Sequence, residues 1–588
     1  MKLSDYIVEF FVRKGIKDFF GYQGTMIAHF VDSIERNEEA RNHSCYNEQG
    51  AAFAACGYAQ AINSCACAYA TSGPGAVNLL SGVANAYFDS LPVIFLTGQI
   101  NTNEYTGIDG LRQHAFQEID IVSMAKPVTK YAVQITDEKQ IVEELNKAYY
   151  IANSGRKGPV LVDLPMNIQR GNVSEPVYDM DNIAFRSFSV VDPRELETAA
   201  DQAVDQILET LAQAERPVML LGNGICDKQT GDILCGFARE HNIPVVTSVL
   251  GMSLLAAEDP INFGCIGGAY GHRYANMITN IKSDLLICLG ISMCTRQTGV
   301  KIHDFAVDAK IIRVDIDPCN MLRDVHENGK NELKFLADVA SVAKKLTEKA
   351  GSFDGDYALW LEKCGEIRNK LNAVDEVVPE RYVNKLVERI SAAMGHCSAV
   401  AVDVGQHMVW GYSSYKNLKG QQMLFSGGHG AMGYALPAAI GAYYATGKPT
   451  ACICGDGAFQ MNIQELQWVV REKIPVSMFV LNNSELGLIC QQQESLFKGL
   501  YAGAAKSGGF TSCSFEKVAA AYGIKATAVN ADISAEQIRN FSAVEEPNLM
   551  EVVLDFGTYA YPKTCFGEPI HNQQPYAPKE IYDQLLSI

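Results

Sequence analysis

The chain has 588 residues and a mass of 64.2 kDa, too long for one hydrophobic core, and this length predicts about three or four domains. Hydrophobic residues make up 48% and charged residues 20%, as in soluble globular proteins. The formal net charge of −18 argues against nucleic acid and an anionic membrane as partners, because both attract basic surfaces. No apolar run approaches the roughly 18 residues that cross a bilayer. The 17 cysteines lack metal-ligand spacing and no secretory signal is evident, so we expect reduced thiols and a cytoplasmic protein.

The N-terminal part of the chain alternates strand-like and helix-like segments. It begins with an amphipathic helix for which Ser4 is the expected N-cap and Gly15 the stop. Further along, Glu48 lies between a short strand and a helix over 51–61, and its neighbours are uncharged. It is either an acid favoured at a helix N-terminus or a carboxylate kept dry for chemistry. A tight turn over 71–76 joins a strand to a helix, and its amides could line a substrate cavity.

The same alternation continues to the C-terminal region and predicts an α/β fold with three doubly wound parallel-sheet domains. We place the domains at residues 1–170, 190–350 and 376–555, with a C-terminal tail at 556–588. In the second domain we expect a helix at 195–214 and strands at 217–221, 244–247, 285–289 and 311–315.

Two polar strand ends stand out in the third domain. An apolar strand over 450–454 stops at Gly455-Asp456-Gly457, and a second strand over 476–481 ends in Asn482 and Asn483, with a helix over 461–471 between them. Carboxyl ends of neighbouring parallel strands meet at one sheet edge, where α/β sheets bind ligands. A carboxylate and an amide suit Mg²⁺ held against a diphosphate, and the glycines let the backbone come close. A Gly-Asp-Gly turn alone is a common surface turn, so the second strand end is what favours a site.

These motifs resemble the cofactor motif of thiamine-diphosphate enzymes, and residues 455–466 are similar to acetolactate synthase and its near relatives. The resemblance spans nearly the whole chain and implies pyrimidine-binding, central and diphosphate-binding domains. It implies that Asp456, Asn483 and the backbone carbonyl of Glu485 hold Mg²⁺. The residues that it places around thiamine diphosphate are Gly405, Gln406, His407, Gly430, Met432, Gly455, Asp456, Gly457, Ala458, Asn483, Glu485, Leu486 and Gly487.

Within this family resemblance, Glu48 is the carboxylate that hydrogen-bonds the pyrimidine ring and so activates the cofactor. The family arrangement places the diphosphate of that cofactor on another subunit. The resemblance therefore implies a homodimer as the smallest working unit, with a homotetramer as the alternative.

Residues 115–118 resemble a motif whose Phe116 and Gln117 approach the substrate, and Arg296 matches an arginine that holds the carboxylate of a second 2-oxo acid. A surface arginine on a turn is the other interpretation of Arg296. The implied function is decarboxylation of pyruvate or another 2-oxo acid and carboligation of the acyl carbanion to a carbonyl acceptor, by a transferase or lyase acting on small molecules. The alternatives are a lyase or hydrolase that cleaves a diketone or 2-hydroxyketone, and a non-catalytic cofactor-binding subunit.

The sequence also departs from acetolactate synthases. Gln492 stands where a tryptophan usually shapes acceptor choice, which suggests an acceptor larger or more hydroxylated than pyruvate. Residues 88–102 resemble a subgroup that adds a two-carbon branch to keto-sugars. FAD is an open expectation for the central domain, because residues 264–271 carry an extra residue and Ser292 replaces an arginine. The tail over 559–576 is either a lid over the site or a docked surface segment.

Overall fold

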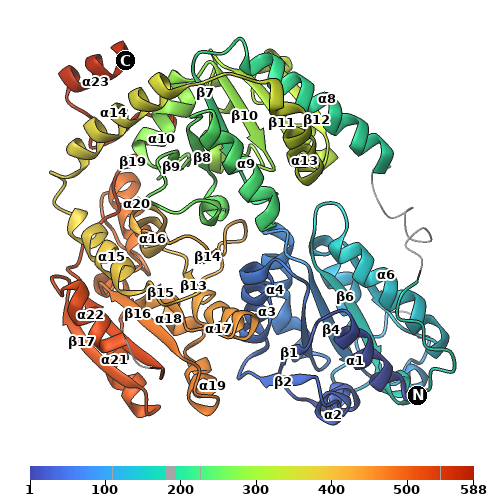
Figure 1. The fold of residues 1–588 in the computed structure, drawn as a ribbon. Coiled ribbons are helices and arrows are strands. Elements are labelled where there is room, and N and C mark those ends of the chain that lie inside the picture. The colour runs from blue at the N-terminus through green and yellow to red at the C-terminus, as the bar shows by residue number, and fades with distance from the viewer. Residues whose placement is uncertain (109, 181–192, 226, 543–544) are drawn as a thin grey trace.

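A computed structural model describes residues 1–108, 110–180, 193–225, 227–542 and 545–588. The described residues form three parallel six-stranded sheets and one two-stranded antiparallel hairpin. Helices cover the sheets, and the three domains lie at the corners of a triangle (Figure 1). The predicted α/β class with three doubly wound domains is confirmed. No helix in the described ranges is both long and apolar enough to span a membrane, and none of the described cysteines is in a disulfide.

The first sheet has the order β2-β1-β3-β4-β6-β5. Its strands are β1 (Asp18–Gly21), β2 (Arg41–Ser44), β3 (Ala66–Ala70), β4 (Val93–Gln99), β5 (Tyr131–Gln134) and β6 (Val160–Pro165). Its helices are α1 (Leu3–Arg13), α2 (Ala28–Arg36), α3 (Glu48–Ile62), α4 (Pro74–Phe88), α5 (Ile121–Ala125), α6 (Ile141–Asn153) and α7 (Met166–Arg170). The expectation for Ser4 is wrong: Lys2 occupies the N-cap, and the hydroxyl of Ser4 lies inside α1, 2.8 Å from that of Ser33.

The central sheet has the order β12-β11-β10-β7-β8-β9, the pattern typical of dinucleotide-binding domains. Its strands are β7 (Pro217–Leu221), β8 (Val245–Thr247), β9 (Asn262–Cys265), β10 (Leu285–Leu289), β11 (Lys310–Asp315) and β12 (Glu332–Leu336). Its helices are α8 (Pro193–Leu211), α9 (Lys228–Glu240), α10 (Arg273–Met277), α11 (Thr295–Thr298), α12 (Pro318–Met321) and α13 (Val339–Lys349). The long helix α14 (Ala358–Asp375) leads from this domain to the third (Figure 1).

The third sheet, β14-β13-β15-β16-β18-β17, repeats the strand order of the first. Its strands are β13 (Ala399–Val402), β14 (Gln422–Phe425), β15 (Thr450–Gly455), β16 (Val476–Asn482), β17 (Lys525–Asn530) and β18 (Asn548–Val553). Its helices are α15 (Arg381–Ala393), α16 (Gln406–Ser414), α17 (Ala435–Thr446), α18 (Asp456–Met461), α19 (Leu466–Arg471), α20 (Gly487–Phe497), α21 (Phe515–Ala521) and α22 (Ala535–Ser542). The tail contains β19 (Lys563–Thr564), β20 (Gln573–Gln574) and α23 (Lys579–Ser587).

Helices α3 and α17 join the first and third domains in one core (Figure 1). They approach so closely that a Cβ on Gly57 would lie 2.3 Å from the carbonyl oxygen of Ala438, and one on Gly441 would lie 1.9 Å from that of Ala54. Only glycine permits this backbone contact. The shared core places the start of α3, and therefore Glu48, against the C-terminal domain.

Candidate active site

Polar side chains gather where three neighbouring strands of the third sheet end. Gln406 and His407 open α16 after β13, Asp456 opens α18 after β15, and Asn483 follows β16 directly. All four are buried, with Asp456 only 3% exposed. The structure therefore brings together the residues that the sequence places at this edge of the sheet. We refer to these four residues and Glu485 as the strand-end cluster.

The strand-end cluster contains polar atoms that lack protein partners. Among the described residues, these buried and unpartnered atoms include Asp456 Oδ2, Glu485 Oε2, Gln406 Nε2 and His407 Nε2. Such atoms are rare in folded proteins, and a group of them in one place is typical of a site that binds a ligand, ion or water. Burial lowers the pKa of His407 to about 3, so its ring is neutral at pH 7 and one nitrogen donates. Two acceptors beside two donor groups match a cation bound to an anionic phosphate.

Asn483 has the geometry of a ligand that is held in place. Its Nδ2 donates to Gln406 Oε1 and to Glu485 Oε1, each at 3.1 Å, which leaves its own Oδ1 available for a cation. The Glu485 carboxylate also accepts from the amide of Gly557 at 2.9 Å, so this side chain is itself held in place and orients Asn483. No group of three or more His, Cys, Asp or Glu residues in the described chain could hold a metal by itself. A cation here would need oxygens from its ligand.

Burial shapes the electrostatics of the strand-end cluster. It raises the pKa of Asp456 to about 6, and it also raises the pKa of Glu485. A bound divalent cation would favour the ionised carboxylate and reverse this shift. The cluster is therefore suited to a positively charged partner.

Glycines make room for the side chains of the strand-end cluster. A Cβ on Gly487 would lie 1.9 Å from Gln406 Oε1, and a Cβ on Gly455 would lie 2.7 Å from His407 Nδ1. Gly457 faces Leu486 and Met432, whose Cδ2 and Cε atoms would lie 2.5 and 3.4 Å from an added Cβ. Ala458 is buried in the same turn. The glycines, Ala458, Leu486 and Met432, all predicted to contact the cofactor, thus lie close to the strand-end cluster.

A buried aspartate that the sequence analysis missed holds the loop over 426–433. Asp403 follows β13 directly and accepts from the amides of Gly433 and Ala435, both at 2.9 Å. The loop carries Gly430, at φ +71°, and Met432, so Asp403 fixes the backbone on which both predicted cofactor residues lie. Its position after an apolar strand, two residues before Gly405, was a signal that could have identified it.

A second cluster forms in the first domain around Glu48. This residue begins α3, three residues earlier than predicted, and its Oε2 accepts from Asn78 Nδ2 at 3.0 Å. A Cβ on Gly75 would lie 2.9 Å from Glu48 Oε1, and one on Gly73 would lie 2.9 Å from the carbonyl oxygen of Gln117. The structure therefore brings Glu48, the turn over 71–76 and Gln117 together.

The two clusters do not meet within the described chain. No hydrogen bond or ion pair joins Glu48 to the strand-end cluster among the described residues. Phe116 is 77% exposed beside Gln117. Arg296 is exposed on α11 and donates to the carbonyl of Gly427, so it lies beside the loop over 426–433 and not in the strand-end cluster.

The junction of the three domains contains another residue without an assigned role in the sequence analysis. Asp89 is 1% exposed and accepts from the amides of Gly427 at 3.0 Å and Gly428 at 2.6 Å. Asn223 of the central domain donates to the Asp89 carbonyl at 3.1 Å. Burial raises the pKa of Asp89 to about 7. Its contacts come from all three domains, which local sequence patterns could not show.

The tail occupies the region predicted to contact a flavin. The amide of Thr564 donates to the carbonyl of Ala269 at 2.8 Å, and Gln573 donates to that of Gly271 at 3.0 Å. Ser292 bonds the side chain of Asn320 at 3.3 Å. The strand order of the central sheet is typical of dinucleotide-binding domains. The contacts of residues 264–271 and Ser292 add no further support for FAD. The tail is therefore docked on the central domain at these residues.

Comparisons with known proteins agree with this arrangement of domains. Three family models, described as the N-terminal TPP binding domain, the central domain and the C-terminal TPP binding domain of thiamine pyrophosphate enzymes, match residues 1–124, 204–346 and 403–552. Thiamine pyrophosphate is another name for thiamine diphosphate.

Full-length relatives are also similar. Acetolactate synthase 1, chloroplastic, of Oryza sativa subsp. japonica is 34% identical over 84% of this chain and 75% of its own length. A probable acetolactate synthase large subunit of Methanocaldococcus jannaschii is 33% identical over 94% of this chain and 92% of its own length. The interpretation as a non-catalytic subunit is therefore set aside, and the chain belongs to the thiamine-diphosphate-dependent, acetolactate synthase-like enzymes, which are transferases or lyases.

Proposed function

We propose that this enzyme decarboxylates pyruvate or another 2-oxo acid and joins the remaining acyl unit to a carbonyl acceptor. The observation that carries the proposal is the set of unpartnered buried atoms in the strand-end cluster, which matches a diphosphate with its cation. Thiamine diphosphate, when bound, supplies the nucleophilic carbon and accepts the electron pair released with carbon dioxide.

The strand-end cluster has separate roles for its donors and acceptors. Gln406 and His407 would donate to diphosphate oxygens, while Asp456, Asn483 and the backbone carbonyl of Glu485 would hold Mg²⁺. Met432 and Leu486 lie beside Gly457 and would provide apolar contacts to the organic part of the cofactor. The polar members of the cluster are buried and the two apolar side chains are partly buried, so water is largely excluded.

Glu48 would hold a proton on the cofactor pyrimidine. Its carboxylate is 7% exposed and is oriented by Asn78 at 3.0 Å, which fixes it in a dry setting. Since no contact joins it to the strand-end cluster of the described chain, we propose that a second copy brings the two halves together in a homodimer. Large apolar side chains are exposed beside both halves, Phe116 at 77% near Glu48 and Phe497 at 63% on α20.

The substrate contacts are proposed from position. Phe116 and Gln117 adjoin the Glu48 cluster and would contact the donor. Arg296 would bind an acceptor carboxylate after releasing the carbonyl of Gly427. Gln492 is exposed on α20, and a polar side chain at this position favours a hydroxylated acceptor such as a keto-sugar.

Product analysis tests the proposed reaction. Labelled pyruvate is incubated with a panel of aldehydes, 2-oxo acids and keto-sugars, products are identified by mass, and flavin absorbance is recorded on the same sample. We expect labelled carbon dioxide and a ligated product. Carbon dioxide and acetolactate from pyruvate alone would identify pyruvate as acceptor, whereas cleavage of a diketone or 2-hydroxyketone without pyruvate turnover would support the lyase or hydrolase alternative and contradict the proposal.

Glu48→Gln and Asp456→Ala test the assigned residues. The first is expected to keep the fold and lose about 100-fold or more in turnover, because the carboxylate that holds the proton is gone. The second is expected to weaken cofactor and Mg²⁺ binding, measured by calorimetry. Glu143→Gln is the control, because it removes an exposed acid from the first turn of α6 in the same domain. Normal turnover in Glu48→Gln, or equal losses in Glu143→Gln, would count against the assignment.

A further inference from the structure

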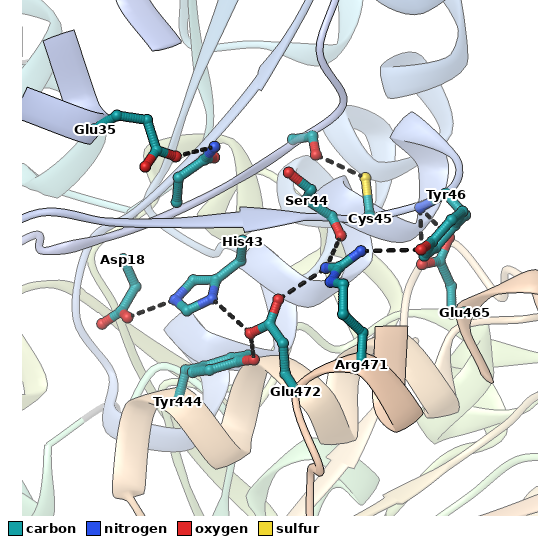
Figure 2. A network of polar contacts seen from close by, with 12 residues as sticks. Asp18, Glu35, His43, Ser44, Cys45, Tyr46, Tyr444, Glu465, Arg471 and Glu472 are labelled. Carbon is teal, nitrogen blue, oxygen red and sulfur yellow. Dashed lines mark hydrogen bonds and ion pairs between the residues drawn. The ribbon is translucent and has the colours of Figure 1, made fainter. Parts of the chain in front are cut away.

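A polar network joins the chain just before Glu48 to the C-terminal domain (Figure 2). Glu465 ends the short 3-10 helix η11 (Ile463–Glu465) and is fully buried at 0% exposure. Both oxygens of its carboxylate accept from the amide of Tyr46, at 3.2 and 3.0 Å. Tyr46 lies two residues before Glu48 in the sequence, so the contact acts on the backbone that leads into α3.

The first turn of α3 is shaped to admit the Glu465 carboxylate. A Cβ on Gly50 would lie 2.6 Å from Glu465 Oε1, so a side chain at this helix position would displace the carboxylate. Asn462 Nδ2, three residues before Glu465, donates to Gln49 Oε1 at 3.2 Å. The start of α3 is thus held from the C-terminal domain at two points.

Arg471 of α19 secures the same loop from its outer side (Figure 2). Its Nη1 donates to the hydroxyl of Tyr46 at 3.1 Å, and its Nη2 donates to the carbonyl of Ser44. Nη2 also pairs with Glu472 at 2.8 Å, which orients the guanidinium. Residues 44–46 are therefore fixed by a buried carboxylate and by a half-exposed guanidinium.

Stability alone does not account for a carboxylate at position 465. An N–H donor needs an acceptor when it is buried, but a neutral amide side chain would also provide one. Burial raises the pKa of Glu465 to about 7, so ionisation of this group at neutral pH opposes folding. The advantage of the carboxylate is a second accepting oxygen and a stronger, charge-assisted bond.

We propose that Glu465 is a positioning residue that sets the direction of the Glu48 carboxylate by fixing the backbone at Tyr46, with Arg471 in support. The inference rests on the proposed role of Glu48. It goes beyond that role because it assigns the orientation of Glu48 to the C-terminal domain of the same chain, through contacts that touch neither cofactor nor substrate.

Two measurements on Glu465→Gln test this inference. The first is amide hydrogen exchange of residues 44–50 in the cofactor-free protein. The second is the rate at which bound thiamine diphosphate exchanges its C2 proton with deuterated water, which requires no substrate. Because one accepting oxygen becomes an NH₂ group, we expect faster exchange at the Tyr46 amide. We expect C2 exchange to slow by about 10- to 100-fold, the range for a misplaced catalytic group.

Matched variants separate positioning from general loss of structure. The side chain of Glu332 in the central domain is also fully buried and accepts from the amides of Val325 at 2.7 Å and His326 at 2.6 Å, so Glu332→Gln should change neither quantity. Arg471→Gln removes the contacts to the Tyr46 hydroxyl, the Ser44 carbonyl and Glu472, but it leaves the bond between Glu465 and the Tyr46 amide in place. It should therefore reduce C2 exchange less than Glu465→Gln. It also keeps the test usable if Glu465→Gln fails to fold.

The outcomes are distinguishable. Normal C2 exchange in Glu465→Gln or, if that variant does not fold, in Arg471→Gln would overturn the positioning role, even with a faster Tyr46 amide. Equal slowing in Glu332→Gln would overturn it as well. If Glu48→Gln itself exchanges C2 normally, the proposed role of Glu48 fails first. Slow C2 exchange in Glu48→Gln and Glu465→Gln, with cofactor affinity unchanged, supports both.

Discussion

Individual glycines decide whether the strand-end cluster can form. Gly487 has an ordinary helical conformation, so its importance comes from space and not from backbone freedom: a Cβ there would lie 1.9 Å from Gln406 Oε1 and 2.7 Å from Asn483 Nδ2. These two side chains are hydrogen-bonded to each other at 3.1 Å. An added methyl group would therefore separate a proposed diphosphate donor from a proposed metal ligand.

We expect Gly487→Ala to bind thiamine diphosphate and Mg²⁺ at least about tenfold more weakly, because overpacking of this size costs about 1–3 kcal/mol. Calorimetry of cofactor binding measures the effect. Gly365→Ala is the control, because Gly365 lies in α14 with open space around it. Unchanged affinity in Gly487→Ala would show that Gln406 can move without loss of the site.

Site residues that follow an apolar strand could be predicted from the sequence, whereas those defined by distant contacts could not. Asp456 and Asn483 each come at the end of a recognisable strand, and parallel topology brings such ends together. Glu465 and its partner Tyr46 are 419 positions apart, so no local pattern connects them. The expected cap at Ser4 failed because the backbone of Lys2 bridges to Asn172 and starts the helix earlier.

At the scale of elements, the predicted single helix over 461–471 is only partly correct. The structure has α18, the 3-10 turn η11 and α19 in its place, and α18 starts at Asp456. Asn462 breaks the helix because it leaves helical geometry, at φ −130°, and its side chain donates to the carbonyl of Gly433 at 2.9 Å. The break places Asp456 in the strand-end cluster and Glu465 against α3, and tertiary contacts, not helix propensity, cause it.

The tail and α20 form a second coupled pair of elements. Gln491 Nε2 donates to the carbonyl of Ala560 at 3.0 Å, and the amide of Ala560 donates back to Gln491 Oε1 at 3.2 Å. The buried Gln491 side chain thus satisfies both the backbone amide and the backbone carbonyl of Ala560, as a neighbouring strand would in a sheet. The tail continues to the central domain, where Arg273 donates to the carbonyl of Gln573 at 2.7 Å.

Gln491→Ala is expected to release the tail from α20. Without the two hydrogen bonds, local opening of residues 557–564 should become easier, while the three sheets stay intact. Hydrogen exchange measured by mass spectrometry should show faster exchange over these residues and over α20. Gln492→Ala, at the exposed neighbouring position, is the control and should leave exchange in the tail unchanged. Equal exchange in both variants would mean that the central-domain contacts alone hold the tail.

For the whole molecule, the alternation of strands and helices predicted three α/β domains but not how they pack. The first and third sheets share one strand order, and the glycine contacts between α3 and α17 join their domains. Gly57 and Gly441 lie in apolar helices and carry no local signal of a partner, so the sequence could not show this interface. Each domain can be inferred from its own periodicity, whereas the interface depends on contacts between distant segments.

A buried histidine lies at this interface between two carboxylates (Figure 2). His43 Nε2 lies 2.8 Å from Asp18 Oδ1 in its own domain, and Nδ1 lies 3.4 Å from Glu472 Oε2 in the C-terminal domain. The centroid of its ring lies 3.7 Å from the ring centroid of Tyr444. Burial opposes the charged ring, but the hydrogen bonds to Asp18 and Glu472 outweigh it and raise the pKa of His43. An imidazolium that donates to both domains therefore stabilises their contact.

The sign of the resulting pH dependence follows from these pKa shifts. Because the pKa of His43 is raised by folding, its contribution is complete below its ordinary pKa of 6.5 and is lost as pH rises through the folded value. Burial opposes ionisation of Glu472, but hydrogen bonds from His43, Tyr444 and Arg471 lower its pKa from 4.5 to about 2, so its contribution is present above 4.5 and is lost as the pH falls towards 2. The network should be strongest between these limits, at about pH 5–6.

We therefore expect His43→Gln to lower the urea midpoint of unfolding most at about pH 5–6 and progressively less as the pH rises through the raised pKa of His43, because the wild-type protein loses its charged contact there. Denaturation of both proteins across this pH range measures the difference. His241→Gln is the control for loss of a buried ring, because His241 is also buried but its Nδ1 lies 2.7 Å from the carbonyl oxygen of Gly355 and not beside a carboxylate. A His43→Gln effect that is constant from pH 5 to 9 would mean that packing against Tyr444, and not charge, accounts for the contribution of His43 to the interface.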